Sequence, residues 1–550
     1  MAGHFKTETA WRVLFAGVFV ALFAAGLSNH ALWTPDEPRV AEIGREMALS
    51  GNWAVPTLNG KPFLEKPPLY FWALASTFRG LGGASHRVAR IPSALFGLGG
   101  VVAVFFLARM LFGLRAGFFS ALILATTFDY LKVSHRVLVD SALACFVISA
   151  MACFMRGYLS GKTRPKFLYY GMFYLFCGLA FLSKGLVGFV IPGLAVLSFL
   201  VFERNLKEIG RMAPWLGAGI VAALCLPWLL ALWQQGGWEY LEVFVVKNHI
   251  QRFLSGGSLG HHKPFYYYLG HFPGSFLPWS LLLVPVAYRS VFGREDLAPR
   301  PRQGVLFMKC WFVSGFVLLS IASTKRTIYL LPLLAPGSVM TAWWIDLTLE
   351  SEGLGRVEGI FVWFFGFLLL VAGLVLGALD LYLSRQWGGV KVAHWLLTIG
   401  LSLGALRFLR RKRLGPFWVA SYGTVFSLFL FLLLWIPPSM DRYKSFVPFC
   451  RQVAGVLEPS SGLYGFRPDE TLRGVVPFYT GRFVKEIDTR ESLEQALDRK
   501  DRVFVVVMDG RGQAEKEVLA TGKAYLLVRR KVDARYICSL LTNRAGEVAE

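Results

Sequence analysis

The sequence predicts a polytopic α-helical membrane protein followed by a smaller α/β domain outside the membrane. Hydrophobic residues make up 55% of the 550 residues and charged residues only 17%, whereas about a quarter of a soluble protein is charged. Many apolar runs reach the roughly 18 residues needed to cross about 30 Å of hydrocarbon, and residues 361–379 are the clearest example. After about residue 437 such runs stop and strand-like segments begin.

The apolar runs divide into thirteen expected transmembrane helices. They cover about residues 11–33, 88–108, 116–131, 138–156, 167–183, 186–203, 213–234, 273–291, 305–323, 328–347, 358–383, 391–407 and 416–436. The patch 67–82 is short and begins with two prolines, so we interpret it as an element that dips into the membrane interface. The first run is too long for a signal peptide and lacks a clear cleavage site, so we interpret it as a retained helix.

The distribution of basic residues predicts the orientation of these helices. With the N-terminus inside, sixteen Lys and Arg residues lie in short inner loops and six in short outer loops, as the positive-inside rule requires. Counting 67–82 as a full span would reverse this bias. Topology therefore explains the net charge of +23, and we do not expect nucleic acid as a partner.

The tail, residues 438–550, then lies outside and has a different character. The segments GLYGF, RFVKEI, RVFVVVMD and AYLLVRR are typical of strands, and amphipathic stretches such as RESLEQALDRK lie between them. This alternation predicts a small α/β domain with a partly parallel sheet. Because the tail has no Gly-rich phosphate-binding motif, we assign it no catalytic role.

The first large outer loop, 34–87, gathers charges directly after an apolar run. Asp36 precedes a helical pattern that places three apolar residues on one face: Val40, Ile43 and Met47. Two interpretations stay open. In one, Asp36 caps this helix and Glu37 interacts favourably with its dipole. In the other, Asp36 or Glu37 faces a cavity at the membrane surface as a general base or a metal ligand.

The same loop contains the segment FLEKPPLYFW. Glu65 and Lys66 precede the stiff Pro67-Pro68 bend, next to aromatic residues expected at the membrane interface. The simpler interpretation is a lysine that extends toward water beside an ion-paired glutamate. The functional interpretation is a rigidly held cation for a lipid phosphate.

Two further outer turns carry charges close to the ends of spans. Asp140 lies one turn inside a span, where an acid is costly unless it is paired or used, and Arg136 is four residues earlier. A structural ion pair between them is therefore the alternative to a functional acid. Lys184 stands alone in a tight outer turn, where we expect an anchor at the membrane interface.

The second large outer loop, 235–272, and a later turn complete the set of candidates. His249 and Arg252 are three residues apart on one face of an expected surface helix, and such a histidine is more often structural. The segment TKRTIYLLPLLAP places Lys325, Arg326 and Tyr329 at the outer mouth of a span, with membrane anchoring as the alternative.

Acids and cations from four outer loops thus gather at one membrane face. This pattern indicates a reaction site at the outer interface that handles an anionic lipid. Cations and tyrosine hydroxyls suit a phosphate that gains charge as it leaves, and a carboxylate suits an acceptor hydroxyl that loses its proton. Low water content would strengthen both effects.

Four motifs carry a resemblance to a known family: DEPRVAEIGREM, LNGKPFLEKPPLYFW, LSKGLVGFVIPG and TKRTIYLLPLLAP. In this order they resemble the bacterial aminoarabinose lipid A transferase family, which belongs with the protein O-mannosyltransferases to the GT-C integral membrane glycosyltransferases. The resemblance covers the thirteen-span core, and the soluble tail has the position and the type of fold expected for this family. It implies a GT-C catalytic domain over residues 1–437, with loops 34–87 and 235–272 forming the site, and a soluble periplasmic domain over 438–550.

The resemblance also implies a role for individual residues. The catalytic acids would be Asp36, Glu37 and Asp140. The donor phosphate would be held by Lys66, Arg252 and Tyr329. Further substrate contacts would come from Glu65, Arg39, Lys325 and Arg326. No cofactor is required, and a divalent cation near Glu65 and His249 is an open alternative.

The function implied by the resemblance is transfer of a hexose or pentose from an undecaprenyl (polyprenyl) phosphate donor. The acceptor would be lipid A or another periplasmic envelope molecule, and the reaction would invert the anomeric configuration. We expect a monomer in the bacterial inner membrane with its active site in the periplasm. The rival functions are a lipid or sugar transporter and a non-catalytic sensor. A transporter is disfavoured because the sequence has no clear internal repeat and its charges cluster at one face rather than at the bilayer midplane.

Overall fold

The computed structural model describes residues 17–251, 263–293, 297–350, 353–385, 388–458 and 461–544. Backbone contacts divide the chain into two compact units. The first contains the chain up to Ala25, Leu64–Tyr70 and Ser93–Ile436. The second combines segments that are distant in the sequence, namely Gly26–Phe63, Phe71–Pro92 and Pro437–Glu550. Most of the first outer loop therefore folds together with the tail.

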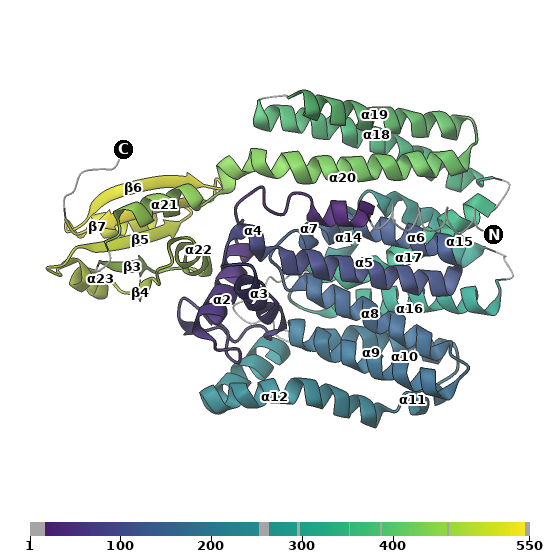
Figure 1. Cartoon of the computed structure of the whole chain (residues 1–550), viewed down its shortest axis with the longest axis horizontal. Coiled ribbons are helices and arrows are strands. Elements are labelled where there is room, and N and C mark those ends of the chain that lie inside the picture. The colour runs from purple at the N-terminus through teal and green to yellow at the C-terminus, as the bar shows by residue number, and fades with distance from the viewer. Residues whose placement is uncertain are drawn as a thin grey trace. The chain divides into compact units, whose positions relative to one another are not determined.

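The first unit consists of long apolar helices that lie side by side (Figure 1). Within the described residues, nine helical segments are long and apolar enough to cross a membrane. They contain α5 (Ile91–Phe112), α8 (Asp140–Tyr158), α9 (Thr163–Lys184), α12 (Pro214–Leu241), α16 (Pro299–Ile321), α17 (Leu331–Glu350), α18 (Arg356–Ser384), α19 (Gly389–Arg410) and α20 (Leu414–Lys444). The apolar helix α10 (Val187–Phe202) is shorter.

Two of the expected spans are broken. Helix α6 (Leu114–Ala125) meets α7 (Phe128–Ser134) at 67°, and α14 (Tyr267–Ser275) meets the segment of η2 (Trp279–Leu282) and α15 (Leu283–Phe292) at 113°. Counting each bent pair as one span gives up to eleven in the described residues. Every predicted span except the first coincides with one of these helices or bent pairs. The first, 11–33, lies partly outside the described residues.

The two breaks contact each other, which explains how both are tolerated. The backbone N–H of Phe128 donates to the Leu277 carbonyl at 2.9 Å. The indole N–H of Trp279 donates to the carbonyl and the hydroxyl of Thr126 at 3.2 and 3.1 Å. A backbone group left open in hydrocarbon is costly, so irregular backbone at this depth requires a protein partner. Each break supplies partners for the other.

The outer-loop part of the second unit begins with α2 (Asp36–Ser50) and the short antiparallel pair β1 (Thr57–Leu58) and β2 (Lys61–Pro62). Helix α3 (Leu69–Gly80) follows after the two prolines, and α4 (His86–Ala89) precedes α5. At 12 residues α3 is only about 18 Å long, too short to cross the hydrocarbon. This agrees with its interpretation as a dipping element.

The tail forms a five-stranded mixed sheet in the order β4-β3-β5-β7-β6. Four strands lie where the sequence predicts them: β3 (Gly462–Phe466), β4 (Lys485–Ile487), β5 (Val503–Asp509) and β6 (Tyr525–Val532). The fifth, β7 (Tyr536–Thr542), was not expected, and it pairs antiparallel with both β5 and β6. Because β3 pairs parallel with β4 and β5, the sheet is partly parallel, as predicted.

Alternate residues of β5 point to opposite faces of this sheet, and both faces are covered. Phe504 and Val506 pack with α21 (Val447–Val456) and α22 (Glu470–Thr480). Val503, Val505 and Val507 pack with α23 (Arg490–Leu497) and α24 (Gln513–Leu519) on the other face. Burial on both faces explains why β5 is a continuous apolar run rather than an alternating one.

Helix α2 of the outer loop packs directly against α22 of the tail. A Cβ atom at Gly474 would lie 2.6 Å from the Cα of Arg39, closer than atoms can approach, so only glycine allows these two helices to touch. Around this contact Asp441 accepts hydrogen bonds from the Ala31 N–H and the Trp33 indole at 3.1 and 3.0 Å. The Tyr479 hydroxyl accepts from the Leu32 N–H at 2.9 Å. The tail thus fixes the residues that lead into α2.

Candidate active site

Glu37 is the most deeply buried acid at the start of α2, with 2% of its surface exposed. Both carboxylate oxygens are bound by the fully buried guanidinium of Arg90, at 2.9 and 3.1 Å. Arg90 also donates to the carbonyls of Leu27, His30 and Ala31, and Glu37 accepts from the Trp33 N–H at 2.9 Å. This network ties the end of the first apolar run to the start of α2.

Two further acids of α2 are also buried and have structural partners. Glu46 accepts from the Thr57 hydroxyl and the Asn59 N–H, both at 2.6 Å, and so holds the β1–β2 turn. Glu42 receives two hydrogen bonds from Arg45, at 2.7 and 2.6 Å. Burial raises the pKa of Glu42 to about 8, against the opposing effect of the Arg45 charge. Most of the charge cluster in this loop therefore builds the loop itself.

Asp36 has a different environment. Pro35 occupies the N-cap of α2, so the capping interpretation of Asp36 is wrong. The Asp36 side chain is 15% exposed and accepts from the Arg39 guanidinium at 2.9 Å. Arg39 also forms an ion pair with Glu470, the first residue of α22. A chain of charges thus runs from the tail through Arg39 to Asp36, the more accessible of the two candidate acids at this helix start.

In the first unit, Asp140 lies at the start of α8 with 3% of its surface exposed. Its ion-pair partner is Lys184, the last residue of α9, rather than Arg136 as the sequence suggested. The reason is tertiary, because α8 and α9 pack along their whole lengths and bring these two ends together. The Lys184 ammonium lies over the ring of Tyr329, 4.1 Å from its centroid.

This geometry corrects the expectation for Lys184 and identifies it as a residue that sequence reasoning missed. An interfacial anchor would extend toward water, whereas the Lys184 side chain is only 10% exposed and lies between a carboxylate and an aromatic ring. Gly185, with φ of 79°, ends α9 directly after it. The sequence feature that could have indicated a role for Lys184 is its place in the LSKG motif, as a single lysine at the end of a long apolar run.

A chain of hydroxyl groups connects this cluster to the EKPP segment. The Tyr70 hydroxyl, in the first turn of α3, is 2.5 Å from Ser93 Oγ, and Ser141 donates to Ser93 at 3.3 Å. Ser141 follows Asp140 directly. Glu65 and Lys66 are half-buried in the bend just before α3. The neighbouring Leu64 carbonyl accepts from Asn248 at 3.4 Å, which links the bend to η1 (Glu242–Gln251).

Lys325 and Arg326 precede Tyr329 in a turn that is held by the last part of the second outer loop. Lys325 is buried and donates to the carbonyls of Lys263 and Ala322, and burial lowers its pKa. The Arg326 carbonyl accepts from the Tyr268 hydroxyl at 3.2 Å. A buried Lys325 does not fit a membrane anchor, because an anchoring lysine reaches out to water.

Arg252 lies outside the described residues, and so does the side chain of His249. Within the described residues, no group of three or more His, Cys, Asp or Glu side chains is arranged to hold a metal ion. The metal candidates Glu65 and His249 therefore stay a prediction. The first unit brings together Asp140, Lys184 and Tyr329, while the second brings Asp36, Glu37 and Arg39 to the start of α2.

The comparisons with known proteins agree on one kind of relative. Residues 65–231 match the family described as dolichyl-phosphate-mannose-protein mannosyltransferase. The undecaprenyl phosphate-alpha-4-amino-4-deoxy-L-arabinose arabinosyl transferase of Edwardsiella ictaluri is 33% identical, over 70% of this chain and 67% of the relative. The enzyme with the same name from Shewanella sediminis is 31% identical, over 78% and 77% of the two chains.

The fold also matches a solved structure over nearly its full length. The crystal structure of ArnT from Cupriavidus metallidurans bound to undecaprenyl phosphate superposes with a TM-score of 0.80. The match covers 98% of each chain at 22% sequence identity. The architecture is therefore shared even though four residues in five differ.

Proposed function

The chain belongs to the undecaprenyl phosphate-alpha-4-amino-4-deoxy-L-arabinose arabinosyl transferase family, and on this premise we propose that it transfers this pentose to lipid A. It is a multi-pass membrane glycosyltransferase of the GT-C type rather than a transporter. The donor is the sugar on undecaprenyl phosphate, as the names of the relatives state for their own reactions.

We place the reaction at the periplasmic face of the inner membrane. Thirteen spans with the N-terminus inside put loops 34–87 and 235–272 and the tail 438–550 on that side. The proposal is supported by the excess of basic residues in the inner loops and by the match of twelve predicted spans to described apolar helices or bent pairs.

The observation that carries the proposal is the cluster of Asp140, Lys184 and Tyr329, which come from α8, α9 and the turn before α17. A buried acid at the end of an apolar helix is costly unless it is paired or serves a site, and here its lysine partner also contacts a tyrosine from a third segment. Lys66, Arg252 and Tyr329 are proposed to hold the donor phosphate. Lys184 keeps the Tyr329 ring in place and adds positive charge beside it.

In the proposed reaction an acceptor oxygen attacks the anomeric carbon of the sugar. The new carbon–oxygen bond forms as the bond to the phosphate oxygen breaks, and undecaprenyl phosphate leaves with the electron pair. Because the acceptor attacks from the opposite side, the configuration of the anomeric carbon is inverted. Cations aimed at the phosphate stabilise the charge that it gains. Asp36 orients an acceptor phosphate or takes the proton of an acceptor hydroxyl. Glu37, with both oxygens bound by Arg90, positions α2.

Transfer of labelled aminoarabinose from undecaprenyl phosphate to lipid A by the purified full-length protein tests this function. Asp36→Asn should lose most of the transfer activity while the protein is produced and folded normally, because an amide neither accepts a proton nor carries charge. Asp498→Asn, a surface acid of the tail paired with Lys523, is the control and should transfer normally. Normal transfer by Asp36→Asn would remove Asp36 from the site, and absence of transfer by the unmodified protein would contradict the function.

A further inference from the structure

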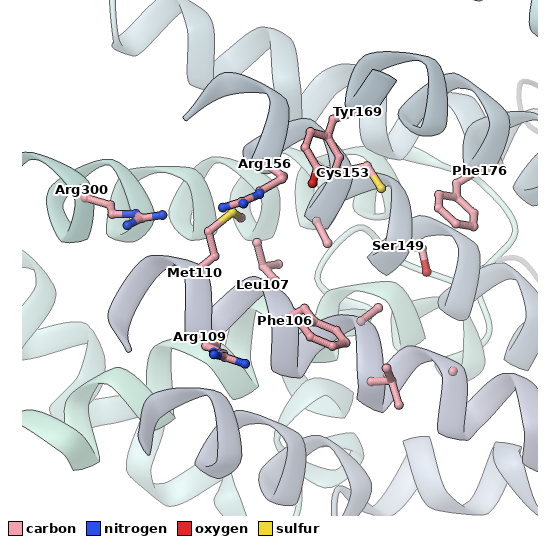
Figure 2. Close-up of a pocket in the computed structure, with 14 residues that line it drawn as sticks. Phe106, Leu107, Arg109, Met110, Ser149, Cys153, Arg156, Tyr169, Phe176 and Arg300 are labelled. Carbon is pink, nitrogen blue, oxygen red and sulfur yellow. The ribbon is translucent and has the colours of Figure 1, made fainter. Parts of the chain in front are cut away.

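A cavity of about 650 Å³, drawn in Figure 2, opens among the helices of the first unit. Its walls come from the C-terminal halves of α5 and α8, the N-terminal half of α9 and the start of α16. Arg156, at its charged end, is 16 residues along α8 from Asp140, which is about 24 Å. The cavity is therefore separate from the cluster that carries the proposed reaction.

Three arginines from three helices line this cavity: Arg109 of α5, Arg156 of α8 and Arg300 of α16. The guanidinium groups of Arg156 and Arg300 point toward one another, and Arg156 also lies over the ring of Tyr169 at 5.7 Å (Figure 2). Within the described part of the chain, none of the three arginines forms an ion pair. A neighbouring arginine, Arg115, is instead paired with Asp346 and Glu350.

The rest of the cavity wall is apolar and continues toward the membrane interior. Gly99, Val102 and Phe106 follow one face of α5, and Phe176 of α9 lies opposite. Val102 and Phe106 are 47% and 56% exposed, so this wall is open to the surrounding hydrocarbon. From Arg109 to Gly99 the wall extends over ten residues, or about 15 Å, which is half of the hydrocarbon thickness.

We propose that this cavity binds an anionic phospholipid of the inner leaflet, with its phosphate at the three arginines and one acyl chain along α5. Guanidinium groups bind phosphate oxygens through paired hydrogen bonds, and three of them that form no ion pair with an acid of the described residues leave a positive charge to be neutralised. The half-bilayer length of the apolar wall fits an acyl chain of one leaflet and not a much longer polyprenyl chain. The arginines also lie on the side that the topology places inside, where anionic lipids attract basic residues.

The test measures which lipids stay bound to the full-length protein. The protein is reconstituted in nanodiscs of phosphatidylcholine with a minor fraction of phosphatidylglycerol, and is then extracted and weighed intact by native mass spectrometry. The arginine variant replaces Arg109, Arg156 and Arg300 by Gln. The control variant replaces Arg410, Arg411 and Lys412 by Gln, which removes the same charge from another inner loop.

We expect retained phosphatidylglycerol to fall at least ten-fold in the arginine variant and to stay unchanged in the control variant, since the loss of even one charged hydrogen bond costs roughly a factor of ten in affinity. A third variant, Val102→Trp, fills the apolar wall and should also reduce retention, which binding of a free phosphate would not explain. Equal losses in the arginine and control variants, or retention of undecaprenyl phosphate instead of phospholipid, would overturn the proposal.

Discussion

Two regions of the helix bundle each contain a carboxylate, an ammonium group and an aromatic ring. In one, Asp140 pairs with Lys184, whose ammonium lies 4.1 Å from the centroid of the Tyr329 ring. In the other, Asp380 of α18 pairs with Lys391 of α19 at 3.1 Å, and this ammonium lies 5.4 Å from the centroid of a Trp435 ring. Both carboxylates are buried. The two ion pairs differ in their aromatic residue and, more importantly, in the residues around them.

The polar groups near Asp380 form hydrogen bonds with one another. Trp435 donates to His394 at 3.3 Å, His394 contacts the Ser427 carbonyl at 3.1 Å, and Thr398 and Ser427 share a hydrogen bond of 2.6 Å. These contacts join α18, α19 and α20, as polar groups between membrane helices commonly do. The cluster therefore has a structural explanation that requires no substrate.

Around Asp140, in contrast, groups from separate outer segments converge. The Tyr70 hydroxyl is hydrogen-bonded to Ser93, which accepts from Ser141, the residue after Asp140, and Tyr70 follows the bend that holds Lys66. The difference teaches that a buried ion pair in a membrane protein does not by itself mark an active site. Convergence of charged loops on the pair is the more informative feature.

The largest expected effect is a difference in transfer rate between variants of Asp140 and Asp380. Asp140→Asn should lower the rate of sugar transfer about 100- to 1000-fold, since a lost electrostatic contact in an active site has this magnitude. Asp380→Asn should lower thermal stability and leave the rate per folded enzyme unchanged. Single-turnover transfer, normalised to folded protein, checks both. Equal losses of rate in the two variants would break the comparison.

The aromatic partners give a smaller and more specific test. Tyr329→Phe keeps the ring face for Lys184 and removes only the hydroxyl, so the binding constant of the donor lipid should weaken about ten-fold through one lost charged hydrogen bond. Trp435→Phe removes the hydrogen bond to His394 and should cost about 1 kcal/mol of stability with donor binding unchanged. Donor binding measured separately from transfer distinguishes these outcomes. Unchanged donor binding in Tyr329→Phe would remove Tyr329 from the phosphate site.

A third test concerns Asp36, the more accessible of the two candidate acids at the start of α2. Glu470→Gln releases Arg39 from the tail, and Asp36 should then be held less firmly by Arg39. We expect transfer to fall about three-fold, because one partly exposed ion pair contributes less than 1 kcal/mol. Glu494→Gln, which loses an exposed pair with Arg490 elsewhere in the tail, is the matched control. A rate equal to that of the control would mean that Arg39 positions Asp36 without help from the tail.

The smallest expected effect is a pH dependence of the contact between the outer loop and the tail. Burial of Glu486 tends to raise its pKa, but hydrogen bonds from Lys61 and Asn59 and the charge of Arg473 outweigh burial and lower it. A lowered pKa stabilises the folded protein above the ordinary value of 4.5, and this contribution is lost as the pH falls through the lowered pKa. Thermal unfolding from pH 6 to 3.5 should show this loss in the unmodified protein and not in Glu486→Gln. If the unfolding temperatures of the two proteins fell in parallel as the pH is lowered, Glu486 would not be the cause of the pH dependence.

Patterns that depend on neighbours in the sequence were predictable. Apolar runs located the spans, and the spacing of Val40, Ile43 and Met47 identified the buried face of α2. Partners across the fold were not predictable, because nothing within ten residues of Asp140 indicates that α9 ends beside it. The breaks at Thr126 and Leu277 were missed for the same reason, since each is stabilised by hydrogen bonds to the other, which is distant in the sequence.

The order in which the chain is made has a consequence for α2. Ala31 binds Asp441, Leu32 binds Tyr479, and Asn59 binds Val484, so these partners are separated by 410, 447 and 425 residues. At a synthesis rate of about 5–20 residues per second, the outer loop is made roughly 20–90 s before its partners in the tail. Until then α2 lacks the tail helix α22 against which it packs. A newly made protein therefore completes the surroundings of Asp36 only after the tail has emerged, and we expect a copy truncated before Asp441 to be inactive.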